Sequence, residues 1–141
     1  MVGGPLQPET LRRKLEPYAP GLSDEALQKL SIYLDLLLRW NRRINLTAIR
    51  NPQRALRELF GESLYLAQVL LLQGRLIDVG TGGGFPGLAV KLIVPDLAVT
   101  LIDSNRRKCA FLKEVVRECG FTDVEVVPER FEVWAGRNPE R

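Results

Sequence analysis

The sequence predicts an α/β fold in which an N-terminal helical cap is followed by a βαβαβ unit. Short apolar runs at residues 76–79, 97–102 and 124–127 are typical of buried strands. Segments with helical periodicity separate these runs, and strands that alternate with helices pair in parallel through right-handed crossovers. A glycine-rich stretch at residues 80–87 directly follows the first run, where the chain has to turn sharply.

The first 73 residues carry helical patterns. Residues 9–15 are expected to form a short helix, and a second helix begins after Ser23, a typical N-cap, and runs to about Trp40. Residues 53–72 are interpreted as one or two amphipathic helices, with Gly61 as the point of separation. We therefore divide the chain into a helical region at 1–73 and a partial sheet domain at 74–141.

Three further segments in the second half are expected to be helical or turn-like. Pro86 suits the first turn of a helix that continues to residue 94. A strong helix over residues 105–119 ends at Gly120, a residue type suited to helix C-termini. Residues 128–134 begin another helix or turn after the third strand.

The glycine-rich stretch allows three interpretations. Gly82, Gly84 and Gly87 fit G-x-G-x-x-G, the dinucleotide fingerprint, which is weak on its own. Asp78, Gly80, Gly82 and Gly84 fit D-x-G-x-G-x-G, which resembles the first motif of S-adenosylmethionine (SAM) methyltransferases. The Asp78 carboxylate would repel a pyrophosphate but tolerate an ammonium and a sulfonium, so it favours SAM. A turn without a ligand is disfavoured, because five glycines in eight residues carry a conformational-entropy cost.

Asp103 ends the second apolar run, 21 positions after Gly82. An acidic residue about 20 positions after such a loop binds the ribose hydroxyls in nucleoside-binding folds. The alternative is a helix N-cap, shared with Ser104, because a helix follows directly. Both roles are compatible, and the spacing favours ribose binding.

Basic residues gather at two helix ends. Arg39, Arg42 and Arg43 crowd the end of the second helix, where they either complement the helix dipole or contact phosphates. Arg106 and Arg107 open the helix at 105–119, where the dipole disfavours cations. A solvated surface is the simple explanation for that cluster, and contact with RNA phosphates is the functional one.

Composition limits the function classes. The 141 residues carry a net charge of +3 and include no histidine, which excludes a Ser-His-Asp or Cys-His mechanism and leaves no plausible zinc site. Cys109 and Cys119 lie on one predicted helix, where a separation of about 15 Å rules out a disulfide. Reduced thiols and the lack of a signal segment or a long apolar run predict a cytoplasmic protein that does not enter a membrane.

Several motifs together resemble the RsmG (GidB) family. The resemblance covers nearly the whole chain in the expected order, and the ending Phe85-Pro86-Gly87 and the triplet at 45–47 are its specific features. It rests on residues 42–47, 62–64, 78–87, 101–104, 108, 111–112 and 130–132.

The resemblance implies a Rossmann-like fold, SAM as the cofactor and 16S ribosomal RNA of the small ribosomal subunit as the partner. The cofactor-binding residues would be Asp78, Gly80, Gly82, Gly84, Phe85, Gly87, Asp103, Phe131 and Glu132. The residues on the RNA side would be Asn45, Arg106 and Arg107. Two departures are Phe131, where the family usually has alanine, and the lack of the histidine that the family commonly has before Glu62-Ser63-Leu64.

The implied reaction transfers a methyl group from SAM to N7 of a guanine. N7 carries a free lone pair and no proton, so the reaction requires alignment rather than a general base or a metal. We therefore name positioning residues and no catalytic residue. A non-catalytic SAM- or RNA-binding module is the alternative, followed by a fragment of an NAD-dependent oxidoreductase and a purely structural role.

The resemblance also implies a seven-stranded sheet of order 3-2-1-4-5-7-6, of which this chain supplies strands 1 to 3. The first strand would then be an apolar edge. We expect either a shortened form of a longer protein or a partner, such as a second copy, that covers this edge.

Overall fold

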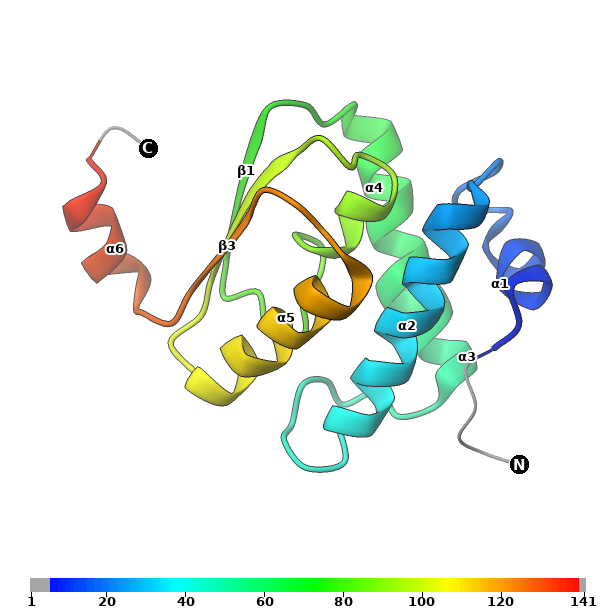
Figure 1. Cartoon of the computed structure of the whole chain (residues 1–141), viewed down its shortest axis with the longest axis horizontal. Helices are drawn as coiled ribbons and strands as arrows, with labels where there is room; N and C mark the ends of the chain where they lie inside the picture. The colour runs from blue at the N-terminus through cyan, green and yellow to red at the C-terminus, as the bar shows by residue number, and fades with distance from the viewer. Residues whose placement is uncertain (1–5, 140–141) are drawn as a thin grey trace.

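The computed structural model describes residues 6–139. The helical half of the chain contains α1 (Pro8–Leu15), α2 (Asp24–Trp40), α3 (Pro52–Ala55), the π-helical segment η1 (Leu56–Gly61) and α4 (Glu62–Leu70). The second half contains β1 (Arg75–Val79), the 3₁₀ segment η2 (Ala89–Leu92), β2 (Ala98–Ile102), α5 (Arg106–Cys119), β3 (Val124–Val127) and α6 (Phe131–Arg137) (Figure 1). The predicted α/β class, with helices before a βαβαβ unit, is confirmed.

The three strands form one parallel sheet in the order β1-β2-β3. Ile77 of β1 is level with Thr100 of β2, and Leu101 is level with Val126 of β3. Parallel pairing, predicted from the alternation of strands and helices, is confirmed. Within residues 6–139, β1 has a strand neighbour on one side only.

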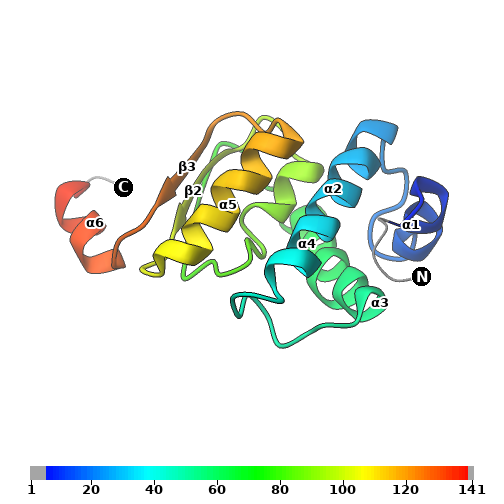
Figure 2. The same cartoon turned by 60° about the horizontal axis from the view of Figure 1, so that its bottom comes forward.

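The two faces of the sheet are covered differently, because successive side chains on a strand point to opposite faces. Leu76, Val99 and Leu101 point into the main apolar core, where α5 packs on the sheet and α2 packs against α5 (Figure 2). On the outer face, Trp134 of α6 is only 4% exposed and packs with Ile102. α6 therefore shields the outer face only near the carboxyl ends of the strands.

α2 forms as its sequence predicts. The Ser23 hydroxyl accepts a hydrogen bond from the Ala26 N–H at 3.0 Å, which confirms the N-cap. Leu30 and Leu37 are fully buried in the core that also contains Leu64 and Phe111. The apolar core thus extends across residue 73, where the chain changes from helices to strands.

Gly61 does not separate two helices. The helical path continues from α3 through η1 into α4, and Gly61 lies buried inside it. A Cβ atom at Gly61 would lie 3.0 Å from two ring carbons of Tyr18. The residue is therefore small because another part of the chain packs against it, which sequence periodicity does not reveal.

The helix expected from Pro86 to residue 94 is reduced to η2. The Phe85–Pro86 peptide bond is cis, and the N–H groups of Leu88 and Ala89 both donate to the Gly84 carbonyl. Lys91 is 1% exposed, and its ammonium donates to the carbonyls of Pro95 and Leu97 at 2.6 and 2.7 Å. Turns anchored on the Gly84 carbonyl replace the regular helix, and Pro95 prevents a helix from continuing beyond residue 94.

α5 is capped by Asn105 rather than by Asp103 or Ser104. The Asn105 carboxamide oxygen accepts from the N–H groups of Arg107 and Lys108 at 2.9 and 3.1 Å. Gly120, with φ of +70°, ends the helix as predicted.

Both cysteines are free and buried on α5. The Cys119 thiol donates to the Lys29 carbonyl at 3.3 Å, and burial raises the pKa of Cys119 to about 12. The part of the chain that the structure describes contains no helix with the length and apolar character needed to cross a bilayer.

Candidate functional site

The glycine loop, residues 80–87, lies at the carboxyl ends of β1 and β2. The Gly80 N–H donates to the Ile102 carbonyl at 2.8 Å, so the start of the loop is held against the end of β2. Gly80, Gly82 and Gly84 have φ values of +71°, +57° and +96°, a region that side chains disfavour. Open α/β sheets bind their ligands at this edge.

Asp78 closes the far end of this loop. Its carboxylate oxygen Oδ2 accepts a hydrogen bond from the Gly87 N–H at 2.9 Å. A Cβ atom at Gly87 would lie 2.5 Å from that oxygen, so the contact requires glycine. Burial raises the pKa of the Asp78 carboxyl above its ordinary value, and the negative charge of Asp103 raises it further. The hydrogen bond from Gly87 lowers this pKa and so opposes the shift.

Asp103 holds the near end of the loop from β2. Its Oδ2 accepts from the Gly82 N–H at 3.0 Å, and its Oδ1 accepts from the Asn105 N–H at 2.9 Å. The carboxylate is partly exposed, and each oxygen has a second lone pair for another donor such as a hydroxyl. The pair that the sequence separates by 21 positions is thus in direct contact.

The predicted glycines divide into two groups by exposure. Gly80 is exposed and Gly82 is partly exposed, whereas Gly84 and Gly87 are buried. The two buried glycines therefore shape the loop from within, and the other two are available to a ligand. Phe85 is half-buried, with its ring stacked on a buried tyrosine and edge-on to Phe60.

That tyrosine, Tyr33, supports the loop from α2, and sequence reasoning missed it. Its fully buried hydroxyl donates to the Gly83 carbonyl at 2.8 Å, and burial raises the pKa of Tyr33 well above its ordinary value. A Cβ atom at Gly84 would lie 2.2 Å from this hydroxyl. The available signal was its place in the apolar stripe, three residues after Leu30.

Asn41 is a second residue that sequence reasoning missed. It is 3% exposed, and its Oδ1 accepts from the N–H groups of Leu46 and Thr47 at 2.8 and 3.0 Å. These two hydrogen bonds bend the segment after α2 toward the glycine loop, and the Leu46 carbonyl lies 3.9 Å from the Cβ position of Gly82. The predicted RNA-side residue Asn45 directly precedes Leu46 and is exposed, and its Oδ1 accepts a hydrogen bond from Arg50 at 3.4 Å.

Phe131 and Glu132 occupy the exposed start of α6. Glu132 forms an ion pair with Arg130 at 3.7 Å, and the Phe131 ring lies 6.2 Å from that of Trp134. Within residues 6–139, no hydrogen bond or ion pair joins either residue to the glycine loop. Their contact with the adenine stays a prediction.

Of the two arginines predicted for RNA contact, Arg106 and Arg107, only Arg107 lines a groove on the surface. Both are exposed in the first turn of α5. Arg107 lines a groove of about 710 Å³ together with Arg39, Arg42, Arg43 and Trp40 from the end of α2. Arg106 is not among the residues that line it. We call this the arginine groove.

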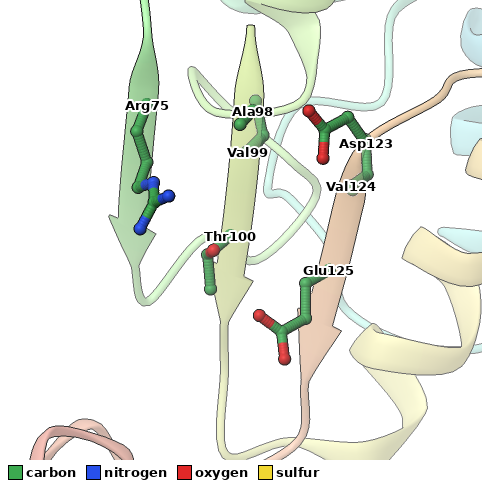
Figure 3. A pocket seen from close by; sticks show the side chains of 7 residues that line it. All are labelled: Arg75, Ala98, Val99, Thr100, Asp123, Val124 and Glu125. Atoms are coloured by element: carbon green, nitrogen blue, oxygen red, sulfur yellow. The ribbon is translucent and has the colours of Figure 1, made fainter. Parts of the chain in front are cut away.

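A second hollow, of about 270 Å³, lies on the outer face of the sheet (Figure 3). Arg75, Thr100, Asp123 and Glu125 line it, and Figure 3 shows the Glu125 carboxylate on the side of Thr100. It lies toward the start of the strands, whereas the glycine loop lies at their carboxyl ends. This hollow is therefore separate from the candidate site.

Comparison with known proteins gives a family for this arrangement. The family model described as rRNA small subunit methyltransferase G (GidB) matches residues 26–140. The chain belongs to this family. The match includes most of α2, the glycine loop, Asp103 and α5, and it confirms the resemblance drawn from the sequence.

Curated relatives carry the same description. The chain is 41% identical to Ribosomal RNA small subunit methyltransferase G of Chromobacterium violaceum over 88% of this chain and 59% of the relative. It is 42% identical to the protein of that name from Desulfitobacterium hafniense over 84% of this chain and 48% of the relative. The chain thus spans about half the length of the curated relatives it matches.

Proposed function

We propose that this chain carries the cofactor-binding part of a SAM-dependent methyltransferase that acts on N7 of a guanine in 16S ribosomal RNA. The observation that carries this proposal is the glycine loop held between two carboxylates, Asp78 and Asp103, at the carboxyl ends of β1 and β2. The cytoplasm is the compartment in which that substrate occurs.

The charge at the loop supports SAM over a dinucleotide. Two carboxylates next to the loop disfavour a pyrophosphate and favour a cationic ligand. Gly80 and Gly82 leave the backbone open to the ligand, and the free lone pairs of Asp103 suit ribose hydroxyls. Phe131 and Glu132 are proposed to reach the adenine.

Methyl transfer to N7 requires the protein mainly to position SAM and the RNA next to each other. When bound, SAM supplies a methyl group on a positively charged sulfur. The loop and Asp103 would hold the cofactor in one orientation, and Asn45, beside Leu46, would contact the RNA next to it. Aligning two reactants in this way lowers a reaction barrier by at most about 7–11 kcal/mol.

Calorimetric titration tests the cofactor proposal. We expect saturable binding of SAM and no binding of NADH, and we expect Asp103→Ala to weaken SAM binding by about tenfold or more. Asp96→Ala is the matched control, because Asp96 follows η2 outside the loop. Binding of NADH in preference to SAM would contradict the proposal and favour the oxidoreductase alternative.

A non-catalytic SAM- or RNA-binding module is the second candidate, and the free edge of β1 within residues 6–139 favours it. Incorporation of a labelled methyl group into small-subunit ribosomal RNA separates the two. SAM binding with methyl transfer supports the enzyme, whereas SAM binding without transfer supports the module.

The β1 edge also motivates a proposal about self-association, since unpaired strand edges add strands. We expect the chain to form a dimer by light scattering, and Val79→Lys, at an exposed position on β1, to weaken it. Val133→Lys on α6 is the matched control, because the two valines are 51% and 52% exposed. A monomer that melts at roughly 45–65 °C, the ordinary mesophilic range, would contradict this proposal.

A further inference from the structure

We propose that the arginine groove binds the phosphate backbone and one base of a single-stranded RNA segment next to the cofactor loop. This inference rests on the proposed function and assigns the surface that holds its substrate. The groove lies between the C-terminal end of α2 and the N-terminal turn of α5.

The charge in the groove is largely uncompensated. Arg39 forms an ion pair with Asp35 at 3.0 Å. In the described part of the chain, Arg42, Arg43 and Arg107 have no carboxylate within 4.0 Å. Arg107 also lies in the first turn of a helix, where the dipole disfavours a cation. Three neighbouring guanidinium groups without internal partners favour an anionic ligand.

The composition and size of the groove favour nucleic acid over a single small anion. Guanidinium groups bind phosphate through two parallel hydrogen bonds, so several of them suit a chain of phosphates. Trp40 adds a half-buried aromatic wall, and bases stack on such side chains with about 1–3 kcal/mol each. The volume of about 710 Å³ lies within the range of about 300–1,000 Å³ typical of pockets for small organic molecules. A nucleotide is a molecule of that size.

Both walls of the groove lead to the glycine loop. On the α2 side, Ile44 lines the groove, and the Leu46 carbonyl two residues later lies beside Gly82. On the α5 side, Arg107 donates its backbone N–H to Asn105, whose own N–H donates to Asp103. RNA held by the arginines would therefore pass next to the residues proposed to hold SAM.

Fluorescence anisotropy with a short labelled single-stranded RNA, measured over a range of salt concentrations, tests this inference. The groove variant is Arg43→Gln with Arg107→Gln. The control is Arg13→Gln with Lys14→Gln, which removes the same charge from exposed positions on α1. We expect the groove variant to bind RNA at least tenfold more weakly and its log–log salt slope to fall by about 1.4, or about 0.7 for each phosphate that is no longer neutralised. We expect the slope of the control to stay unchanged.

Three outcomes would overturn the inference. Equal losses in the groove and control variants would show an effect of net charge alone. An unchanged salt slope in the groove variant would remove these arginines from the RNA surface. Competition by polyglutamate as effective as that by unlabelled RNA would assign the groove to acidic proteins instead.

Calorimetric titration of the same variants with SAM separates this inference from the proposed function. We expect both variants to bind SAM like the unchanged chain, because neither alters the glycine loop. Failure of the unchanged chain to bind SAM would overturn the proposed function, while the anisotropy comparison would still decide the groove.

Discussion

Gly84→Ala is expected to destabilise the chain by about 2–5 kcal/mol. The new Cβ atom would lie 2.2 Å from the Tyr33 hydroxyl and 3.1 Å from Leu112 and Leu88, all in the packed core. Overpacking of this kind costs about 1–3 kcal/mol. The φ of +96° adds about 1–2 kcal/mol for a residue with a Cβ atom. Urea unfolding measures the change in the free energy of unfolding.

Gly136→Ala is the matched control for this substitution. Gly136 lies in α6, and within residues 6–139 no atom other than those of its own helix backbone and chain neighbours lies within 4 Å of its Cβ position. Alanine there is expected to leave stability unchanged or to raise it by up to about 1 kcal/mol, because glycine disfavours helices. A loss of stability in the control as large as that of Gly84→Ala would contradict the role of the Tyr33 contact.

A double-mutant cycle identifies the atom responsible. Tyr33→Phe removes the hydroxyl and leaves the buried Gly83 carbonyl without its donor, at a cost of about 1–3 kcal/mol. Combined with Gly84→Ala it also removes the closest clash. The double variant should therefore be more stable than the sum of the two losses predicts, by about 0.5–3 kcal/mol. Simple additivity would show that the clash lies elsewhere.

Asp78→Ala is expected to lower stability by about 1–3 kcal/mol and SAM affinity by about tenfold or more. The substitution leaves the Gly87 N–H without its acceptor and frees the end of the glycine loop. Asp78→Asn keeps an acceptor at the same place and should retain more of both properties. Urea unfolding and SAM titration of the two variants give the comparison. Equal losses in Ala and Asn would argue against the Gly87 hydrogen bond as the cause.

The pH dependence of stability, compared between the unchanged chain and Asp78→Asn, tests whether the ionised Asp78 carboxyl costs stability. Burial raises the pKa of Asp78, so the folded chain binds this proton more readily than the unfolded chain, whose value is about 3.8. The ionised carboxyl therefore costs stability at neutral pH, and acidification through the raised pKa relieves that cost. The free energy of unfolding of the unchanged chain minus that of Asp78→Asn should rise between pH 7 and about 3.8. A decrease on acidification would mean that the ionised form stabilises the fold.

Local features of this chain were predictable because few neighbouring residues control them. The Ser23 cap, the α2 stripe and the end of α5 at Gly120 all follow from side chains and backbone preferences within one or two helical turns. The spacing between Gly82 and Asp103 also predicts their proximity, since parallel strands bring their carboxyl ends to one edge.

One error occurs where a distant segment decides a local conformation, and the other where local turns replace a regular helix. The sequence allows one or two helices over residues 53–72, with Gly61 as the point of separation, but the reason for glycine there is the ring of Tyr18. The sequence also predicts a helix that opens at Pro86, but the turns anchored on Gly84 leave room only for η2.

The sequence alone determined the order of helices and strands, the parallel sheet, the glycine loop and the family of this protein. These properties depend on residue patterns and spacings that can be recognised along the sequence without knowledge of tertiary contacts. Only the tertiary structure decided that Tyr33 supports Gly83, 50 residues away, and that Arg43 shares a groove with Arg107. Such contacts depend on how α2 packs against the loop and α5, and that packing arises from the collective burial of apolar side chains rather than from any local pattern.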